Sequence, residues 1–374
     1  MRICFITFRY PGKYNKTDFV FVKNLVDAIA ALGNDCHVIA PFSITHYHRF
    51  SSPKEKYTQG KGTITVYRPG YLSFSKFHIG KFRFSDWTHK RAIHKAFRML
   101  IEKPDIIYGH FWNSAYDGYD YARQNNIPLF VATGESKLSE MFHPKADQTE
   151  FSNYVSGVIC VSSKNRDESI AMGLTTANKC AVFPNAIEAD LFRKMDKNQC
   201  RGQIGIPQNV FVVAFVGWFN ERKGIKRVSE AIKTIKGQNV YSFFIGKGEL
   251  EPDCENILFK GSLPHNQIPI YLNAADVFVL PTLHEGCCNA IVEALACGLP
   301  IVSSDLPFNW DVLDETNSIM VDPNNLKEIA SAISVLRDNK ELREQLSKGA
   351  LHKAESLTIS QRANAIMKFI ESKI

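Results

Sequence analysis

Two glutamates flank an expected helix start in the stretch LHEGCCNAIVEALACGLPIVSSD, residues 283–305. The preceding run DVFVLPT is apolar and of strand length, and Cys-Gly-Leu-Pro marks the end of the helix. Glu285 therefore falls in the loop after a strand, and Glu293 falls about one turn into a helix that Asn289 can cap. A helix start offers free N–H groups and a positive dipole end to a phosphate. A carboxylate on either side of that phosphate suits a nucleotide sugar, which joins a sugar, a diphosphate and a ribose.

A lysine in a second turn indicates the same chemistry. Lys223 lies between an apolar strand that ends at Gly217 and a helix expected from Gly224. An ammonium at the end of a strand can neutralise the charge that develops on a departing diphosphate. A glutamate or lysine taken singly is more often a solvated surface residue, so the functional interpretation depends on the combination.

These candidate residues are positioned by an alternation of apolar strands and helix-length segments. A strand at 2–8, an amphipathic helix stopped by Gly33 and a strand at 36–42 form one βαβ unit, which implies a parallel sheet covered on both faces. Further buried strands are expected at 105–111, 128–134, 156–163, 180–185, 210–217, 241–246, 257–261, 276–282 and 300–305. The pattern predicts an α/β protein with two doubly wound, Rossmann-like parallel-sheet domains.

The apolar periodicity lapses near residues 185–202, where the domains are expected to join. We predict an acceptor-binding N-terminal domain over residues 1–190 and a nucleotide-sugar-binding C-terminal domain over 191–358. A last helix within 359–374 is expected to pack back toward the N-terminal domain. Ligands of open α/β sheets bind outside the carboxyl ends of the strands, so two such domains facing each other would enclose a cleft.

The composition narrows the class of protein. The 374 residues are 45% hydrophobic and carry a net charge of +7 with a pI of about 8.8, which favours anionic partners. The nine cysteines show no Cys-x-x-Cys spacing and are interpreted as reduced core thiols. The opening MRICFITF is typical of a strand rather than a signal peptide, and no apolar run reaches the length of a membrane span. We therefore expect a cytoplasmic protein.

The stretch around the two glutamates resembles the Glu-x7-Glu signature of the family 4 glycosyltransferases. Other segments follow the order and spacing of that family, namely KPDIIYGH (103–110), VFPNAIEADLF (182–192), FVGWFNERKG (215–224), FIGKGELE (244–251), FKGSLPHNQIPIYLNAADVFVLPTLHEG (259–286) and IMVDPNN (319–325). The resemblance implies the GT-B fold and retaining transfer of a sugar from a nucleotide donor, UDP- or GDP-linked, to a glycan or lipid-linked acceptor. It implies no cofactor, and the absence of an Asp-x-Asp pair at a strand end favours a reaction without a metal ion.

The resemblance also implies roles for individual residues on the donor side. Glu293 would hold the ribose, Glu285 would contact the transferred sugar, Lys223 would pair with the diphosphate, and His110 would face the donor sugar from the first domain. Sugar, phosphate and base would further meet the backbone of Gly246, Ser262, Leu263, Gly286, Cys287, Cys288 and Asn289.

The sequence departs from the family pattern in four places, one of which is Gly286, Cys287 and Cys288 where many members have Gly-Phe-Gly. Trp218 follows Gly217 where an arginine is common, and Arg222 is expected to supply the missing charge. The first loop offers Gly12 and Lys16 to the acceptor instead of a Gly-Gly pair, and Glu135 stands where a histidine is often found.

Residues 44–103 carry 13 Lys or Arg against three acidic residues, a balance of +10, interleaved with aromatic residues. This pattern favours binding of the segment to anionic lipid headgroups on the inner face of the cytoplasmic membrane. One alternative is that the aromatic residues belong to the core and the charges form a solvated face. The other is nucleic-acid binding, which we do not expect because no recognised nucleic-acid motif accompanies the segment.

Rival functions are another GT-B enzyme such as a nucleotide-sugar epimerase and an exported two-lobed sugar-binding protein, which the absent signal peptide disfavours. A dinucleotide oxidoreductase is disfavoured because GKGELE lacks the third glycine of its fingerprint.

Overall fold

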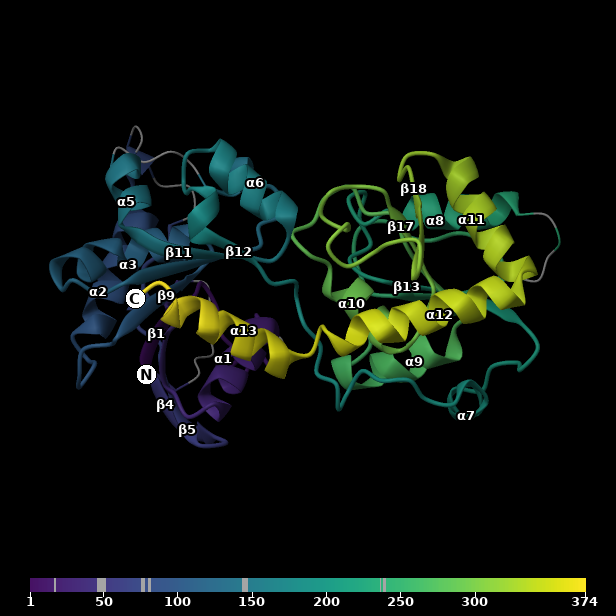
Figure 1. Ribbon diagram of the computed structural model, residues 1–374. Helices are drawn as coiled ribbons and strands as arrows, with labels where there is room; N and C mark the ends of the chain where they lie inside the picture. The colour runs from purple at the N-terminus through teal and green to yellow at the C-terminus, as the bar shows by residue number, and fades with distance from the viewer. Residues whose placement is uncertain are drawn as a thin grey trace. The chain divides into compact units, whose positions relative to one another are not determined.

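The computed structural model describes residues 1–16, 18–45, 52–74, 78–79, 82–142, 147–235, 237 and 240–374. The chain divides into two compact units (Figure 1). The first comprises Met1–Phe183 with Ile359–Ile374, and the second comprises Pro184–Thr358. The first unit thus ends at residue 183 rather than at the expected 190, and it includes the last helix.

The first unit is built on an eight-stranded sheet with the order β12-β11-β10-β9-β1-β2-β5-β4. Every pairing in it is parallel except that of β4 with β5. The strands are β1 (Arg2–Ile6), β2 (Asp35–Ile39), β4 (Lys54–Gln59), β5 (Gly62–Tyr67), β9 (Ile106–His110), β10 (Leu129–Thr133), β11 (Val155–Cys160) and β12 (Cys180–Val182). Two short pairs join β3 (Phe42–Ser43) to β6 (Gly70–Tyr71) and β7 (His78–Ile79) to β8 (Phe82–Arg83).

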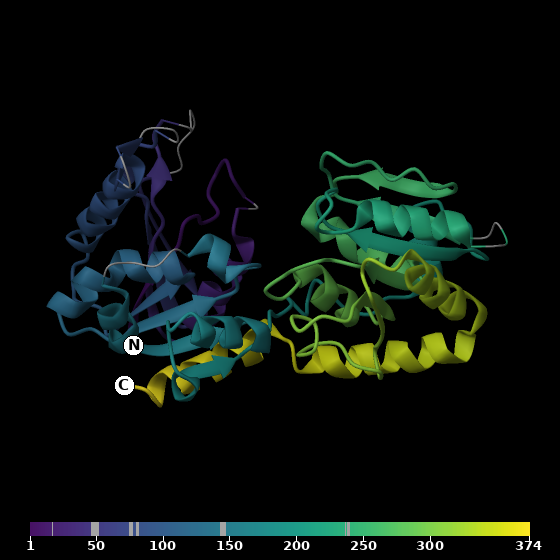
Figure 2. The same cartoon turned by 90° about the horizontal axis from the view of Figure 1, so that it is seen from above.

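Helices cover both faces of this sheet because its strands are apolar on both sides. The helices are α1 (Val20–Ala31), α2 (Phe84–Phe97), α3 (Trp112–Gln124), α4 (Leu138–Met141), α5 (Gln148–Tyr154), α6 (Ser163–Ala171) and α13 (Ile359–Glu371). One core lies between the sheet and α1 with α13, and the other lies between the sheet and α2, α3 and α5. The two views of Figures 1 and 2 show α13, in yellow, alongside this unit, and its residues Ala363, Ile366, Met367 and Ile370 are buried in the first core.

The strands β4 and β5 were not among those that the sequence predicts. β4 is a polar edge strand in which five of six residues are exposed, so it lacks the apolar run that marks the buried strands. Charged, lysine-bearing edge strands are a common protection against pairing with other chains. β5 follows after a tight turn and pairs with β2 in parallel.

The second unit holds a six-stranded parallel sheet with the order β15-β14-β13-β16-β17-β18. The strands are β13 (Phe211–Val216), β14 (Val240–Ile245), β15 (Ile257–Gly261), β16 (Val277–Leu280), β17 (Ile301–Ser304) and β18 (Ser318–Val321). Its helices are α7 (Lys197–Gln203), α8 (Ile225–Thr234), α9 (Ile268–Ala274), α10 (Asn289–Ala296), α11 (Leu326–Asp338) and α12 (Lys340–Glu355).

The strand order of the second unit reverses between β13 and β16. Ligands of doubly wound sheets bind at such a point, outside the carboxyl ends of the strands. The loop after β13 contains Lys223, and the loop after β16 contains Glu285, so the fold brings together two candidates that are 62 residues apart in the chain.

Candidate active site

Lys223, Arg222 and Glu285 meet at the switch point of the second unit. The Lys223 ammonium lies 2.7 Å from the Glu285 carboxylate, which also accepts hydrogen bonds from the Arg222 guanidinium and, at 2.9 Å, from the Thr282 hydroxyl. The two loops are joined by a hydrogen bond of 2.9 Å from the Leu283 N–H to the Arg222 carbonyl. Two cations face one carboxylate, so the cluster carries a net positive charge.

Lys223 is buried yet charged. Its ammonium also contacts the Cys288 sulfur at 3.4 Å. Burial lowers the pKa of Lys223, but the adjacent Cys288 and Glu285 side chains outweigh that effect, and the pKa lies above its ordinary value. Gly224, which follows, has φ of +80°, and a Cβ there would lie 2.7 Å from the Pro281 carbonyl oxygen. Only glycine permits this close approach of the two loops.

The start of α10 lies against this cluster. Gly286, Cys287 and Cys288 are buried, and Cys288 takes the N-cap position without a side-chain cap bond. The prediction that Asn289 caps the helix is wrong, because Asn289 is its first residue and its side chain accepts a 2.7 Å hydrogen bond from Asn185. The first N–H groups of α10 point out of the helix and have no partner within it. A helix start beside two cations is an anion-binding arrangement.

Glu293 lies one turn into α10, as the sequence predicts, and forms an ion pair with His265. The imidazole Nε2 is 3.0 Å from the carboxylate, and only 14% of the Glu293 side chain is exposed. Burial raises the pKa of Glu293, and the hydrogen bond from His265 offsets part of this. The hydrogen bond to Glu293 in turn raises the pKa of His265, whose ring also packs on Phe192 at 5.0 Å. No sequence pattern singles out His265, because a lone histidine between two strands carries no functional signal.

A pocket of about 250 Å³ lies at the carboxyl ends of β13 and β14. Ser262 and Leu263, the residues expected near the base, line it, together with Trp218 and with Gly246, which was expected beside the nucleotide. Gly246 has φ of +152°, and a Cβ there would lie 1.9 Å from the Gly217 carbonyl oxygen. Trp218, which departs from the family pattern, is 56% exposed. Its large flat ring at the rim offers a stacking surface to an aromatic base.

His110 ends β9 in the first unit and is buried. Its ring contacts Phe21 at 5.5 Å and Phe111 at 4.8 Å between centroids, and its Nδ1 has no hydrogen-bond partner among the described residues. Burial, with a smaller effect of the Arg362 charge, lowers the pKa of His110 to about 3. The imidazole is therefore neutral at physiological pH.

Of the three acceptor-side candidates, Glu135 has a structural role in the first unit. Its buried carboxylate accepts hydrogen bonds from the Trp112 N–H at 3.0 Å, the Gly134 N–H at 2.9 Å and the Thr133 hydroxyl at 2.6 Å. It thereby caps α3 from the loop after β10 and holds the turn at Phe111, whose φ of +78° is strained for a residue with a side chain. That turn follows His110 directly.

The other two acceptor-side candidates lie in the loop after β1. Gly12 lines a pocket in that region of the first unit, and Lys16 is exposed.

The basic and aromatic segment 44–103 divides into buried and exposed aromatics. Tyr67 is buried, and Tyr57 donates a 2.9 Å hydrogen bond to Asp27, so these belong to the core. Phe74 and Trp87 are exposed, and the Arg91 guanidinium lies over the Trp87 ring at 4.7 Å. Tyr47, Phe50 and Phe77 lie outside the described residues.

Nine free cysteines are present, and all but Cys180 are buried. Within the described ranges, no helix combines the length and apolar character needed to cross a bilayer. The same residues contain no group of three or more His, Cys, Asp or Glu that could hold a metal ion.

Solved structures define the class of the fold. Sucrose-phosphate synthase from Thermosynechococcus elongatus matches with a TM-score of 0.79 at 17% identity, over 100% of this chain and 98% of that chain. HepE from Anabaena, solved in complex with UDP-glucose, matches with a TM-score of 0.70 at 17% identity over 100% of both chains. The fold is that of the GT-B glycosyltransferases, which confirms the predicted fold class.

Sequence comparisons define the family. The model for glycosyltransferase family 4 matches residues 19–191, and the model for glycosyl transferases group 1 matches residues 196–353. TuaC of Bacillus subtilis, a glycosyltransferase named for teichuronic acid biosynthesis, is 26% identical over 89% of this chain and 88% of its own length. An Escherichia coli enzyme, named as a UDP-Gal:α-D-GlcNAc-diphosphoundecaprenol α-1,3-galactosyltransferase, is 28% identical over 64% of this chain and 68% of its own length. The chain belongs to the family 4 glycosyltransferases.

Proposed function

We propose that the protein transfers a sugar from a nucleoside diphosphate donor to a lipid-linked glycan acceptor in the synthesis of a surface polysaccharide. The name of TuaC supports the polysaccharide, and the Escherichia coli name supports an acceptor built on a diphosphoryl lipid. UDP is the first candidate for the donor nucleotide, because that name and the HepE complex both contain it, and GDP is the second.

The observation that carries the proposal is the convergence of Lys223, Arg222 and the α10 start beside Glu285. These groups supply positive charge to a diphosphate without a metal ion. Glu293, one turn further, accepts hydrogen bonds from the ribose hydroxyls, and the pocket beside Trp218 takes the base. The three parts of the donor thus correspond to three adjacent features of one sheet edge.

We propose that transfer retains the anomeric configuration and uses no protein nucleophile. The Glu285 carboxylate is held by three donors, which makes it a poor nucleophile and a good positioning group for the sugar hydroxyls. Lys223 and Arg222 stabilise the negative charge that accumulates on the leaving diphosphate as the glycosidic bond breaks. The leaving phosphate oxygen then takes the proton of the acceptor hydroxyl on the same face. His110, neutral at physiological pH, donates or accepts a hydrogen bond rather than a proton.

We further propose that the protein works on the inner face of the cytoplasmic membrane, held there by the exposed part of the 44–103 segment. Trp87 and Arg91 are exposed along α2, Arg83 is exposed directly before it, and exposed Phe74 contacts Phe84 on the same helix. An aromatic ring at the headgroup level and cations toward anionic lipids are a favourable combination.

Titration calorimetry in metal-free buffer tests the donor assignment with UDP, GDP, ADP and CDP. We expect one of the uracil or guanine nucleotides to bind several-fold more tightly than the others. If none of the four binds, the donor site is wrong.

Cosedimentation with vesicles tests the membrane proposal. We expect binding to phosphatidylglycerol vesicles and not to phosphatidylcholine vesicles, and we expect Trp87→Ser with Arg91→Glu to reduce it several-fold. Trp310→Ser, which alters an exposed tryptophan of the second unit, serves as the control. Equal sedimentation of all variants would contradict the proposal.

A further inference from the structure

A second pocket of the second unit lies at the amino ends of two strands. Ala275 and Asp276 directly precede β16, Leu299 and Pro300 directly precede β17, and these four residues line a hollow of about 370 Å³. The two strands are parallel neighbours, so the hollow lies at the edge of the sheet opposite to the one assigned to the donor. Small-molecule sites typically enclose about 300–1,000 Å³. The hollow is therefore large enough for a ligand of its own.

One face of α12 forms another wall of the hollow. The lining residues of this helix recur at the spacing of a single helical face, and they are Lys340, Arg343, Glu344, Ser347 and Lys348. Lys194 and Lys197, before and at the start of α7, complete the lining. Five basic and two acidic side chains thus line the hollow, a balance of +3.

The two acidic side chains are already occupied by cations. Asp276 faces two of them, because its carboxylate lies 2.7 Å from the Lys197 ammonium and 2.8 Å from the guanidinium of buried Arg201. Glu344 lies 3.7 Å from Lys340. Neither carboxylate is left to neutralise the remaining basic side chains.

Three cations of the hollow have no acidic partner. Among the described residues, no carboxylate forms an ion pair with Lys194, Arg343 or Lys348. Arg343 is held in place, because its guanidinium lies over the Phe211 ring at 5.5 Å. Partial burial, together with the neighbouring Lys197 charge, lowers the pKa of Lys194. An anion in the hollow would offset both of these effects on Lys194.

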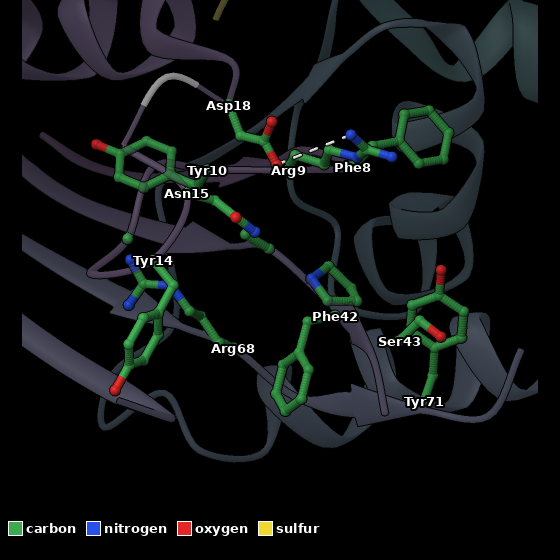
Figure 3. A pocket seen from close by; sticks show the side chains of 13 residues that line it. Phe8, Arg9, Tyr10, Tyr14, Asn15, Asp18, Phe42, Ser43, Arg68 and Tyr71 are labelled. Carbon is green, nitrogen blue, oxygen red and sulfur yellow. Dashed lines mark ion pairs between the residues drawn. The ribbon is translucent and has the colours of Figure 1, made fainter. Parts of the chain in front are cut away.

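The pocket of the first unit differs in this respect. In Figure 3, the Arg9 guanidinium faces the Asp18 carboxylate at 3.8 Å, as the dashed line marks. Arg68, which lines the same pocket, donates to the Glu55 carboxylate at 2.9 Å. Both guanidinium groups of that pocket are paired with a carboxylate, whereas the hollow beside α12 has an excess of cations.

We propose that the hollow beside α12 binds a small soluble molecule that carries a phosphate group. A phosphate monoester has roughly two negative charges at neutral pH and three strong acceptor oxygens, so it can accept hydrogen bonds from Lys194, Arg343 and Lys348 together. A carboxylate has one charge and two oxygens and would leave more of the positive charge uncompensated. The apolar Leu299 and Pro300 are available to the organic part of the molecule.

The hollow and the donor site must be distinguished in the test, because α10 begins at one and ends beside the other. The helix has eight residues and is therefore about 12 Å long. Competitive acetylation of lysine amines on the full chain, followed by mass spectrometry, reports on each lysine separately. The probe is inorganic diphosphate, and sodium chloride at equal ionic strength controls for screening.

We expect diphosphate to slow the acetylation of Lys194 and Lys348 at least about threefold, because a bound phosphate covers each ammonium and holds its proton. Lys353, five residues further along α12 and outside the hollow, should react at an unchanged rate. Saturating UDP or GDP should leave the protection in place.

Two variants test the role of the charge. Lys348→Gln should raise the diphosphate concentration that half-protects Lys194 about fivefold, because one of the three unpaired cations is lost. Lys353→Gln, on the same helix, is the matched control and should leave that concentration unchanged.

The proposal is overturned if chloride protects the two lysines as well as diphosphate does, if nucleotide abolishes the protection, or if the two variants behave alike. Phosphatidylglycerol vesicles are a second probe, and protection by vesicles but not by diphosphate would overturn it in favour of a lipid headgroup. Protection by diphosphate in a protein that binds no nucleotide would support the hollow and contradict the donor site. Nucleotide binding without protection of Lys194 and Lys348 would contradict the hollow alone.

Discussion

The ammonium of Lys223 lies 2.7 Å from the Glu285 carboxylate and 3.4 Å from the Cys288 sulfur. One cation thereby connects the loop after β13, the loop after β16 and the start of α10. Because Lys223 and Glu285 are buried together, changing Glu285 leaves Lys223 without its carboxylate partner, whereas changing Lys223 leaves Glu285 paired with Arg222 alone. Different substitutions at these positions therefore test the effect on catalysis and the effect on nucleotide binding separately.

Glu285→Gln keeps the shape of the side chain and removes the charge that faces Lys223 and Arg222. We expect kcat to fall about 100-fold, because the group that positions the transferred sugar is altered, while nucleotide affinity changes less than about threefold. Initial rates over a range of donor concentrations measure both. Glu230→Gln, at a partly exposed residue of α8, is the control. An unchanged kcat would remove Glu285 from the catalytic machinery.

Trp218→Ala removes the ring at the rim of the pocket assigned to the base. Stacking on an aromatic side chain is worth about 1–3 kcal/mol per base, so we expect nucleotide affinity to fall at least about fivefold. In the parent, nucleotide binding is expected to quench tryptophan fluorescence. Trp310→Ala, at a tryptophan that is 58% exposed, should keep both the quenching and the affinity. If Trp218→Ala also keeps both, the base lies elsewhere.

His110 is expected to act as a neutral imidazole. Since its pKa is lowered to about 3, it is unprotonated throughout the usual assay range. The pH profile of kcat between about pH 5 and pH 8 should therefore show no step from this residue, although His110→Ala lowers kcat about tenfold or more. A step near the ordinary histidine pKa that is present in the parent and absent in the variant would contradict this expectation.

His265 couples stability to pH through Glu293. The hydrogen bond to Glu293 raises the pKa of His265 in the folded protein. Protonated His265 therefore stabilises the folded state fully below the unfolded pKa of histidine, and this contribution is lost as the pH rises through the higher folded pKa. We expect His265→Gln to lower the Tm of the protein more at about pH 6 than at about pH 9. Thermal unfolding at the two pH values measures this, and a pH-independent difference would show that His265 is uncharged.

Much of the fold could be predicted because buried parallel strands are continuous apolar runs. The strands β13, β14, β15, β16 and β17 fall within one or two residues of their expected ranges, and Gly224 and Gly246 stand where close backbone approach demands glycine. The polar edge strand β4 lacked this signal and was missed.

The site could be predicted in part, because its main groups are close to strand ends. Lys223, Glu285 and Glu293 each follow a recognisable strand or helix boundary. His265 and the capping role of Glu135 could not be found, since both depend on which segments the fold brings together. Trp218 was visible as a departure, but its place beside Ser262 and Leu263 is a property of the sheet order.

The central claim is that Glu293 and Lys223 bind two parts of one nucleotide donor at the same edge of the sheet. Glu293 binds the ribose, and Lys223 binds the diphosphate. Calorimetric titration of the nucleoside diphosphate that binds, and of its bare nucleoside, tests this claim on Glu293→Ala and Lys223→Ala. Glu230→Ala and Lys226→Ala, at partly exposed residues of α8, are the controls. We predict that Glu293→Ala weakens both ligands about tenfold, whereas Lys223→Ala weakens the diphosphate about tenfold and leaves the nucleoside unchanged. Variants that bind both ligands like the parent, or a Lys223→Ala that weakens the two equally, would contradict the claim.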